Sequence, residues 1–599
     1  MQVTFLTLAY IISVNSNIIA DSGGPCGVDD YSGSDKSFGA RFGDQGYLDC
    51  VSEVRKNLIT ATAAASMVGT FVMGGFANLP LALAPGMGLN AYFTYNVVGY
   101  YGSGSVPYKD ALTAVFIEGW IFILLSITGA RQLLIKLLPK TLSLSMATGI
   151  GLFLAHIGLQ ASEGLGVVTA DGATLVTLGG CDVDYRAHPY YIRPNETSYA
   201  TVCPADPTSF TADGVALPNL PAPGPNYQCI GGHKLHGAAT WLGIAGFAIM
   251  VILMSRGFRG AIIVGVMFAT IIAWIPGHGA SYLGNTSNLP GGIGGTGPSR
   301  WSYFKKVVAA PTLDKTGLAF NFPGLGTGEV WIALVTFLYV DFFDTTGTLF
   351  SMANFINNFI PGMSLPSLQS LHACFIDDNK NFPRSVQAYC ADGLAIVVGS
   401  MMGTSPCTTY IESATGIQSG GRTGVTALVV CFYYFLCLFF APILASIPVF
   451  ATGPALILVG ALMMINVVKI PWEDILHAVP AFLTIVLMPL TYSIAYGVIG
   501  GLVAYIICSF TRKALDWGSA HTNGAFGTHN VKEDIEGPRT RERTNHLHPI
   551  VKPTKSMELP PDIPVNELEE MDIKMAAAER HPIEMSTAHD DSAHRTSPV

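Results

Sequence analysis

The sequence predicts an all-α polytopic membrane protein with about fourteen transmembrane segments, arranged as two inverted repeats of seven. Half of the 599 residues are hydrophobic and only 12% are charged, whereas soluble domains carry about a quarter charged residues. Apolar runs close to the roughly 20 residues that cross a bilayer recur along the chain. Two of these runs are interrupted by Pro and Gly, and each is third in its group of seven.

Seven apolar runs make up each half of the predicted bundle. The first seven spans are Val3–Ala20, Leu58–Ala77, Leu79–Tyr100, Ala111–Gly129, Leu142–Leu159, Leu235–Met254 and Gly260–Ile275. The second seven are Glu329–Ile356, Tyr389–Met402, Met401–Thr423, Val425–Ile447, Pro454–Val467, Pro471–Pro489 and Leu490–Phe510. An odd number of spans per half makes the second half run with inverted topology.

Polar segments separate and follow these spans. Residues 160–234 and 277–328 are expected to be extracellular loops. Residues 511–599 are charged and Pro-rich with few large apolar side chains, which predicts a disordered cytoplasmic tail. The first apolar run has the length of either a short span or the core of a signal peptide, but no basic segment precedes it, which favours the span.

Loop charges place both termini in the cytoplasm. Cytoplasmic loops are enriched in Lys and Arg, and this orientation puts inside Arg131, Lys136, Lys140, Arg256, Arg259, Lys380, Arg384, Arg422 and Lys469. The two glycosylation sequons, at Asn195 and Asn285, and five loop cysteines then lie outside, where glycans and disulfides occur. Cys26 and Cys50 are a plausible disulfide pair. The external basic pairs that count against this orientation are Arg55/Lys56 and Lys305/Lys306.

Two interrupted spans, Leu79–Tyr100 and Met401–Thr423, are the predicted substrate site. Broken helices near the bilayer midplane are typical of transporter sites, and non-helical backbone is tolerated there only if it lines a cavity or is buried in protein. The alternative is that Pro and Gly merely allow close helix packing. Glu412 is the strongest candidate, because burial without a counter-charge disfavours a carboxylate and makes proton binding feasible near neutral pH. A purely structural buried acid is the alternative for Glu412.

The eighth span carries a polar stripe. Asp341, Asp344, Thr345 and Thr348 are spaced i, i+3, i+4 and i+7, so they share one helix face. Two acids on one face must point to a cavity or to partner groups rather than to lipid. We expect one of the two acids near the substrate and the other in a structural role, which includes bonding to broken-span amides.

Other polar residues within the spans have simpler interpretations. Asn90, after two glycines, could read the edge of a planar heterocycle, but an amide that ties two helices together is almost as well supported. Glu118 and His156 are lone polar residues and are expected to have packing or helix-pairing roles. Glu473, Asp474 and His477 are consistent with a helix start.

Four stretches resemble the AzgA-like purine permeases, a branch of the nucleobase/ascorbate transporter superfamily that carries hypoxanthine, adenine and guanine. They are LAPGMGLNAYF (Leu83–Phe93), DFFDTTGTLF (Asp341–Phe350), GTSPCTTYIESATGIQSGGRTG (Gly403–Gly424) and PAFLTIVLMPLTYSIAYGVIGG (Pro480–Gly501). The resemblance implies a core domain of spans one to four, within residues 1–159, and eight to eleven, in residues 329–447. It also implies a gate domain of span five and of residues 235–276 and 448–510.

The resemblance also implies the site. Purine-binding positions fall on Asn90, Asp341 and Glu412, supported by Asp344, while Glu412 and Asp341 are the proton-coupling candidates. The pocket-shaping residues are Gly88, Thr345, Ser413 and Thr415.

The expected function is proton-coupled purine import across the plasma membrane by an elevator-like shift of core against gate. No cofactor, resident metal or nucleic acid is expected. The residues leave the oligomeric state open, and a homodimer is a candidate because relatives of the resembled fold are often dimers. Alternatives are uracil, xanthine/urate or cytokinin-like purines on the same fold, or a sensor or channel. Two acids without a basic residue argue against an anion, and the lack of a nucleophile–base set or metal site argues against an enzyme.

Overall fold

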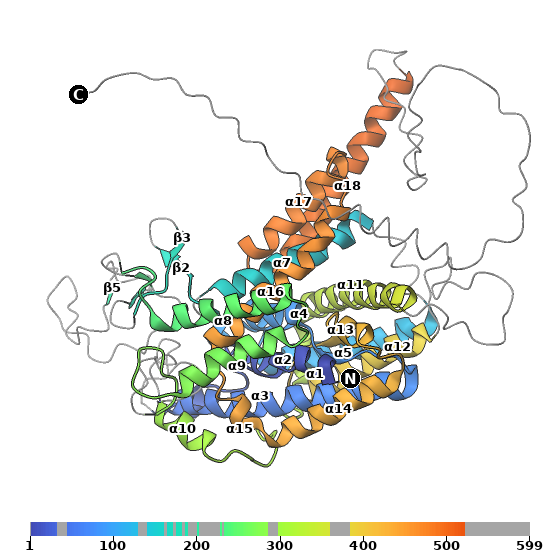
Figure 1. Ribbon diagram of the computed structural model, residues 1–599. Helices are drawn as coiled ribbons and strands as arrows, with labels where there is room; N and C mark the ends of the chain where they lie inside the picture. The colour runs from blue at the N-terminus through green and yellow to red at the C-terminus, as the bar shows by residue number, and fades with distance from the viewer. Residues whose placement is uncertain are drawn as a thin grey trace, which may run out of the picture. The chain divides into compact units, whose positions relative to one another are not determined.

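A computed structural model describes eleven segments of the chain (Figure 1). They are residues 2–32, 45–129, 140–160, 164–171, 175–182, 186–189, 201–202, 228–229, 233–284, 297–359 and 384–521. Contacts divide the chain into Met1–His521 and Thr522–Val599, and the second unit lies outside the described residues. The sequons at Asn195 and Asn285 also lie outside them, so glycosylation stays a prediction.

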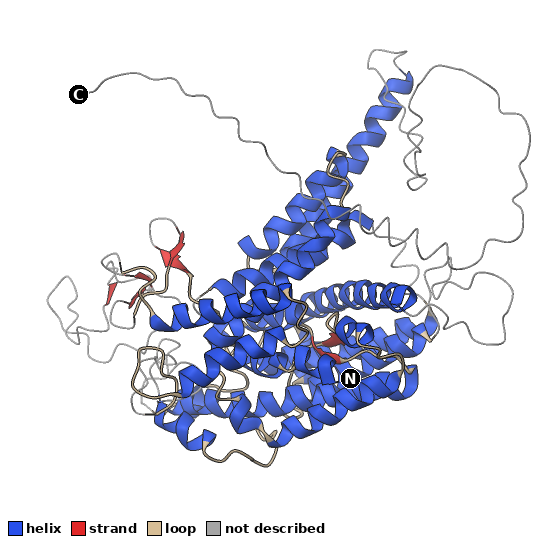
Figure 2. Cartoon of the chain, in the orientation of Figure 1, coloured by secondary structure: helices blue, strands red, loops and turns tan. Residues whose placement is uncertain are grey.

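The described chain is a bundle of apolar helices (Figure 2). Eight helices are long and apolar enough to cross a membrane: α3 (Gln45–Val72), α5 (Tyr108–Thr128), α7 (Lys140–Leu159), α8 (Ala238–Ser255), α11 (Gly328–Phe359), α12 (Ser385–Met402), α16 (Val449–Met463) and α18 (Ile494–His521). Four apolar stretches are shorter: α1 with α2 (Gln2–Leu8, Tyr10–Ala20), α9 (Ala261–Trp274), α14 (Gly424–Phe439) and α17 (Ile475–Leu490). With the two broken segments they fill the fourteen predicted positions, so the all-α polytopic fold is confirmed.

The two broken segments have matching designs. In the first, strand β1 (Leu83–Pro85) leads into helix α4 (Met87–Ala91) and the π-helical η4 (Tyr92–Val98). In the second, strand β7 (Cys407–Thr409) leads into helix α13 (Ser413–Gln418). The sequence predicts both interruptions, and each is a short strand followed by a half-length helix.

Helix contacts support the inverted repeat. The second span α3 packs against the eleventh, α14, and correspondingly the ninth, α12, packs against the fourth, α5. The same exchange relates the pair α8 and α16 to the pair α17 and α7. The third and tenth segments contact each other directly through β1 and β7. Such exchanged partners are what a two-fold axis in the membrane plane produces.

An ordered strap, residues 305–327, joins helices of the predicted core on the side predicted to be external. It includes the short helix η7 (Phe322–Gly326) and follows α10 (Gly297–Phe304). Its backbone N–H groups donate to one acceptor on each of α3, α5, α12 and α14. The bonds run from Lys315 to Asn57 Oδ1 (3.3 Å), Asn321 to Thr113 Oγ1 (2.9 Å), Leu318 to the Met401 carbonyl (2.7 Å) and Ala309 to the Phe439 carbonyl (3.0 Å).

Disulfides and small sheets lie in the loops. The Cys26–Cys50 disulfide, which the sequence predicts, is present. Cys181 pairs with Cys229, an assignment that the sequence left open. Two small sheets occupy the described parts of the 160–234 loop: β2 with β3 (Val168–Asp171, Leu175–Leu178), and β5-β4-β6 (Thr201–Val202, Arg186–Pro189, Gln228–Cys229).

The boundary of the predicted tail needs correction. Helix α18 continues to His521, whereas the sequence predicts disorder from Thr511. The extra turns hold Arg, Lys, Ala and Leu, which propagate a helix readily once it has formed.

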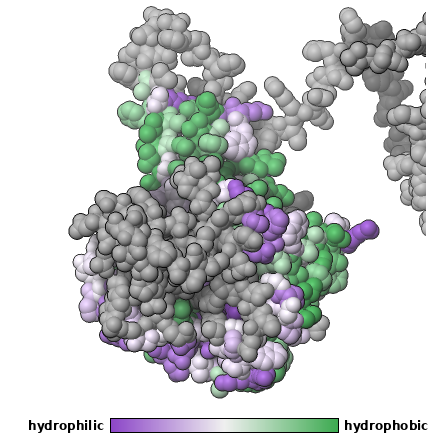
Figure 3. Space-filling view, turned by 90° about the vertical axis from the view of Figure 1, so that its left-hand side faces the viewer, coloured by the Kyte–Doolittle hydropathy of each residue, from purple (hydrophilic) through white to green (hydrophobic). Residues whose placement is uncertain are grey.

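Large apolar side chains remain exposed on the predicted gate helices. They include Leu462, Ile475, Phe482, Leu490, Ile506 and Phe510, each at least half exposed. Figure 3 shows apolar surface of this kind on one face of the molecule. Exposed apolar area of this extent is expected of side chains that face lipid.

Candidate functional site

The two broken segments meet as a short antiparallel ladder. Leu83 lies opposite Thr409 and Pro85 opposite Cys407. Beyond the strands, the Gly86 N–H donates to the Pro406 carbonyl at 2.9 Å, and the Tyr410 N–H donates to the Ala82 carbonyl at 3.0 Å. Within a bilayer, non-helical backbone must find partners in the protein. Each broken segment therefore supplies the hydrogen bonds that the other lacks.

Hydroxyl side chains complete this backbone pairing. The Ser413 hydroxyl accepts from the Ala82 N–H at 3.0 Å. Thr70 on α3 accepts from the Leu83 N–H at 3.0 Å, and its own hydroxyl donates back to the Leu83 carbonyl at 3.2 Å. Ser413, a predicted pocket residue, thus has a visible role in fixing the strand.

Glu412 lies directly before helix α13 and is only 8% exposed. The Tyr10 hydroxyl on α2 donates to Glu412 Oε1 at 3.1 Å. Among the described residues, none of the ion pairs involves Glu412. The carboxyl therefore has a neutral donor and no cation, as the sequence predicts for this position.

The polar stripe of α11 faces this segment. Asp341 and Thr345 are fully buried, whereas Asp344 is half-buried. The Thr345 hydroxyl lies 2.9 Å from the Thr408 hydroxyl on β7, and Asp344 is close enough to Glu412 to interact with it electrostatically. The structure thus brings the two acidic elements predicted from the sequence to one place.

A buried acid that the sequence analysis did not single out joins them. Asp392 on α12 is fully buried, and it accepts hydrogen bonds from Thr345 at Oδ2 (2.5 Å) and from Thr409 at Oδ1 (3.0 Å). It therefore connects the α11 stripe with strand β7. The signal was available, because an ionisable residue inside an apolar span marks a candidate functional position.

Asn90 lies in a network of buried amides and hydroxyls. Its Nδ2 donates to Asn15 Oδ1 on α2 at 3.0 Å. Asn15 Nδ2 in turn donates to Thr62 Oγ1 on α3 (2.8 Å) and to Thr404 Oγ1 (2.9 Å). This geometry is that of an amide tying helices together, which was the alternative interpretation. Asn90 Oδ1 has no partner among the described residues, so a ligand role for Asn90 stays a prediction.

Gly88 and Thr415 occupy different edges of the site. A Cβ at Gly88 would lie 3.0 Å from Ile494 Cδ1 on α18 and 3.1 Å from Ile150 Cγ2 on α7. Gly88 therefore faces two predicted gate helices. The Thr415 hydroxyl donates to the Glu412 carbonyl at 2.8 Å and lies 3.3 Å from the Thr7 hydroxyl, at the contact between α13 and α1.

Comparison with known proteins identifies the family. The permease family profile for xanthine and uracil permeases matches residues 44–180 and 225–500, which is more than half of the chain. The chain belongs to this xanthine/uracil permease family. The resemblance to AzgA-like purine permeases within the nucleobase/ascorbate transporter superfamily is thereby confirmed.

Three relatives each match more than four-fifths of the permease. A Schizosaccharomyces pombe protein named as a xanthine/uracil permease is 40% identical, over 86% of this chain and 71% of its own length. The efflux pump notK' of Aspergillus versicolor is 39% identical, over 84% and 76%. The guanine/hypoxanthine permease PbuO of Bacillus subtilis is 33% identical, over 85% and 90%.

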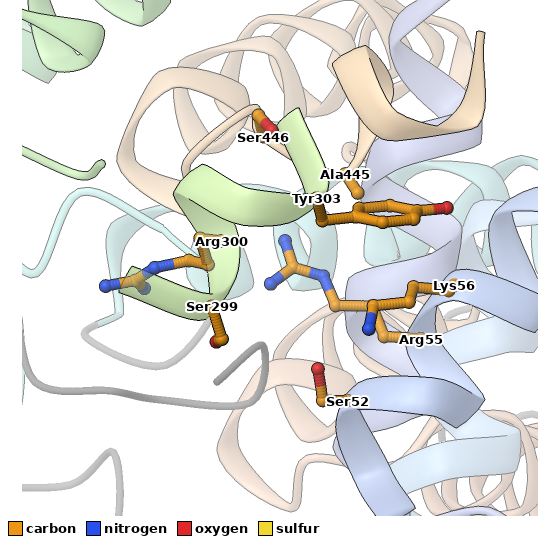
Figure 4. A pocket seen from close by; sticks show the side chains of 8 residues that line it. All are labelled: Ser52, Arg55, Lys56, Ser299, Arg300, Tyr303, Ala445 and Ser446. Carbon is orange, nitrogen blue, oxygen red and sulfur yellow. The ribbon is translucent and has the colours of Figure 1, made fainter. Parts of the chain in front are cut away.

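A separate basic pocket of the permease lies on the side predicted to be external (Figure 4). It is lined by Ser52, Arg55, Lys56, Ser299, Arg300, Tyr303, Ala445 and Ser446. Arg55 Nη1 donates to the Tyr282 hydroxyl at 3.2 Å, and the Arg300 guanidinium lies 4.0 Å from the centre of the Tyr282 ring. None of these residues belongs to the acidic site around Glu412 and Asp341, so the basic pocket is a separate feature of the described chain.

The arginines of the basic pocket should make the stability of the permease depend on pH through Tyr282. Burial alone would raise the pKa of Tyr282, but the Arg55 and Arg300 guanidiniums outweigh burial and lower it from 10.0 to about 8. The stabilising contribution of ionised Tyr282 is therefore fully present above pH 10 and is lost as the pH falls through 8. We expect the thermal stability of the wild type, relative to Tyr282→Phe, to rise between pH 8 and 10, to an extent of about 2–3 kcal/mol.

Ultraviolet difference titration of the purified permease measures the ionisation of Tyr282 directly. One tyrosine should ionise near pH 8 in the wild type and be missing from Tyr282→Phe, while Tyr303→Phe keeps that early step. Identical titration curves for the wild type and Tyr282→Phe would contradict the prediction.

Proposed function

We propose that the permease imports purine nucleobases in symport with protons. The observation that carries this proposal is the meeting of two broken segments beside buried acids that have no ion pair with a cation among the described residues. Carboxylate oxygens accept hydrogen bonds, and the ring and exocyclic N–H groups of adenine, guanine and hypoxanthine donate them. An anionic substrate would instead require positive charge at the site.

The substrate would lie between the third and tenth segments. Glu412 and Asp341 would accept from the purine N–H groups, with Asp344 beside them. Asn90 would offer an amide, and Gly88, Thr345, Ser413 and Thr415 would shape the pocket. The guanine/hypoxanthine activity in the name of the relative PbuO supports a purine rather than a pyrimidine.

Proton coupling would use the acids themselves. A carboxyl that is buried without a cation is costly to ionise, so Glu412 or Asp341 can bind a proton together with the neutral substrate and release it on the other side. No cofactor is needed for this cycle.

Movement would follow the elevator scheme. The strap 305–327 bonds to helices α3, α5, α12 and α14, which supports their movement as one body against the gate. The proposal also places the permease in the plasma membrane with both termini in the cytoplasm. It includes external glycans at Asn195 and Asn285 and assembly as a homodimer.

Export is the second candidate, because a relative of 39% identity is named as an efflux pump. The deciding experiment measures labelled hypoxanthine, guanine and adenine in a purine-transport-deficient host at several external pH values. We expect accumulation above the external level that is greater at acidic pH and abolished by a protonophore. Net loss of preloaded purine indicates export, equilibration without accumulation indicates a channel, and no flux indicates a sensor. Competition by uracil and xanthine tests the alternative substrates.

A further inference from the structure

Glu118 on α5 is a fully buried acid whose role the proposed function does not use. Its side chain is 0% exposed, and neither carboxyl oxygen has a hydrogen-bond partner among the described residues. The sequence predicts a packing or helix-pairing role for it. A helix-pairing role requires a donor on the neighbouring helix, and the described residues provide none.

Asp341 shares this condition. It is also 0% exposed, and neither of its carboxyl oxygens has a hydrogen-bond partner in the part of the chain that the structure describes. Helix α5 packs against both α11 and α12, and Asp341 interacts electrostatically with Glu118. Two buried carboxyl groups on packed helices thus present four oxygens to which the described residues donate no hydrogen bond.

Asp392 is the contrasting member of the group. Hydroxyl donors from Thr345 and Thr409 bond its two oxygens, and such bonds stabilise a carboxylate. Glu118 and Asp341 both interact with Asp392 electrostatically. Within the described segments, the other titratable groups that interact with this cluster are Asp344 on α11 and the Cys407 thiol on β7, and neither is a cation.

These surroundings cannot hold Glu118 and Asp341 as two charged groups. Like charges at a shared buried site disfavour double ionisation, as in carboxyl pairs that share one proton. A proton would also supply the hydrogen-bond donor that the four carboxyl oxygens lack. A proton therefore satisfies both the charge and the hydrogen-bond requirement of the pair.

We propose that Glu118 and Asp341 form a buried pair that holds the transported proton, with Glu118 as a positioning residue that acts on the substrate site through Asp341. This inference rests on the proposed function. The pair keeps one shared proton throughout the cycle. A second proton from the external solution binds the pair when the purine binds, and one proton leaves to the cytoplasm after the purine. No bond other than the carboxyl O–H forms or breaks.

The test compares the wild type with Glu118→Gln in proteoliposomes, with purine uptake and proton uptake measured over a range of pH. Glutamine has nearly the same shape but cannot take up or release a proton. We expect the rate of purine exchange, measured without a proton gradient, to stay within about twofold of the wild-type rate. This difference is smaller than the tenfold change that corresponds to about 1.4 kcal/mol. Proton-driven accumulation should fall at least about tenfold, and its dependence on pH should disappear.

Ser126→Ala is the matched control, because Ser126 is buried on the same helix and, among the described residues, bonds only to the Phe122 carbonyl of its own helix. It should leave both readouts unchanged. If Glu118→Gln keeps the wild-type pH profile and proton-to-purine ratio, Glu118 is structural and the inference is wrong.

If Glu118→Gln does not fold, Glu118→Asp takes its place, since it keeps the carboxyl but moves it away from Asp341 by one methylene. A shifted pH midpoint supports the pair and an unchanged one overturns it. A wild type without purine uptake, or with uptake that ignores the proton gradient, instead contradicts the proposed function.

Discussion

Glu412→Gln is expected to abolish proton-driven purine accumulation while leaving the permease at the cell surface. Glutamine keeps an oxygen that can accept from the Tyr10 hydroxyl, which donates to Glu412 Oε1 at 3.1 Å, so the local packing should survive. The substitution removes the carboxylate that would accept hydrogen bonds from the purine N–H groups. Loss of a charged hydrogen-bond acceptor costs about 1.5–3 kcal/mol, so purine affinity should fall about 10- to 100-fold.

Uptake of labelled hypoxanthine, normalised to surface protein, measures this effect. Glu329→Gln is the control, because Glu329 is exposed at the start of α11 and outside the site. Tyr10→Phe should give a smaller loss, since it removes one donor and keeps the carboxyl. Undiminished accumulation in Glu412→Gln would remove Glu412 from the mechanism.

Gly88→Leu is expected to stop transport by blocking the contact between the α4 segment and the predicted gate. Even a Cβ at Gly88 would lie 3.0–3.1 Å from the Ile494 and Ile150 side chains, which is closer than ordinary packing. Overpacking of a buried contact costs about 1–3 kcal/mol. The free-energy cost of this contact would change as the α4 segment slides against the predicted gate. We therefore expect the transport rate to fall at least about tenfold.

A rescue experiment separates blocked movement from general misfolding. Gly88→Leu combined with Ile150→Ala and Ile494→Ala should regain part of the uptake, because both obstructing side chains are shortened. Gly347→Ala is the matched glycine control, since its Cβ would meet nothing within 4 Å. If Gly88→Leu transports at the wild-type rate, Gly88 does not lie on a moving interface.

Local sequence properties are enough to predict the membrane fold and the two interrupted spans. Charge, hydropathy and Pro/Gly content are local properties, so they identify the spans, the broken segments and the acids Asp341 and Glu412 without knowledge of any partner. The helical spacing of Asp341, Asp344 and Thr345 likewise predicts one polar face. In the structure, the Thr345 side chain on this face contacts strand β7. The end of the last helix was missed, because its continuation past Thr511 depends on helix propagation rather than on hydropathy.

Which of these groups meet depends on how the helices pack in three dimensions. The β1–β7 ladder joins residues more than 300 positions apart, and its partners depend on how the two repeats interlock. Asp392 is part of the site because the Thr345 and Thr409 hydroxyls donate hydrogen bonds to it. Asn90 connects two helices because its amide donates a hydrogen bond to Asn15. Glu118 interacts with Asp341 because α5 packs on α11. Pairing across helices depends on long-range packing, which neither composition nor periodicity encodes.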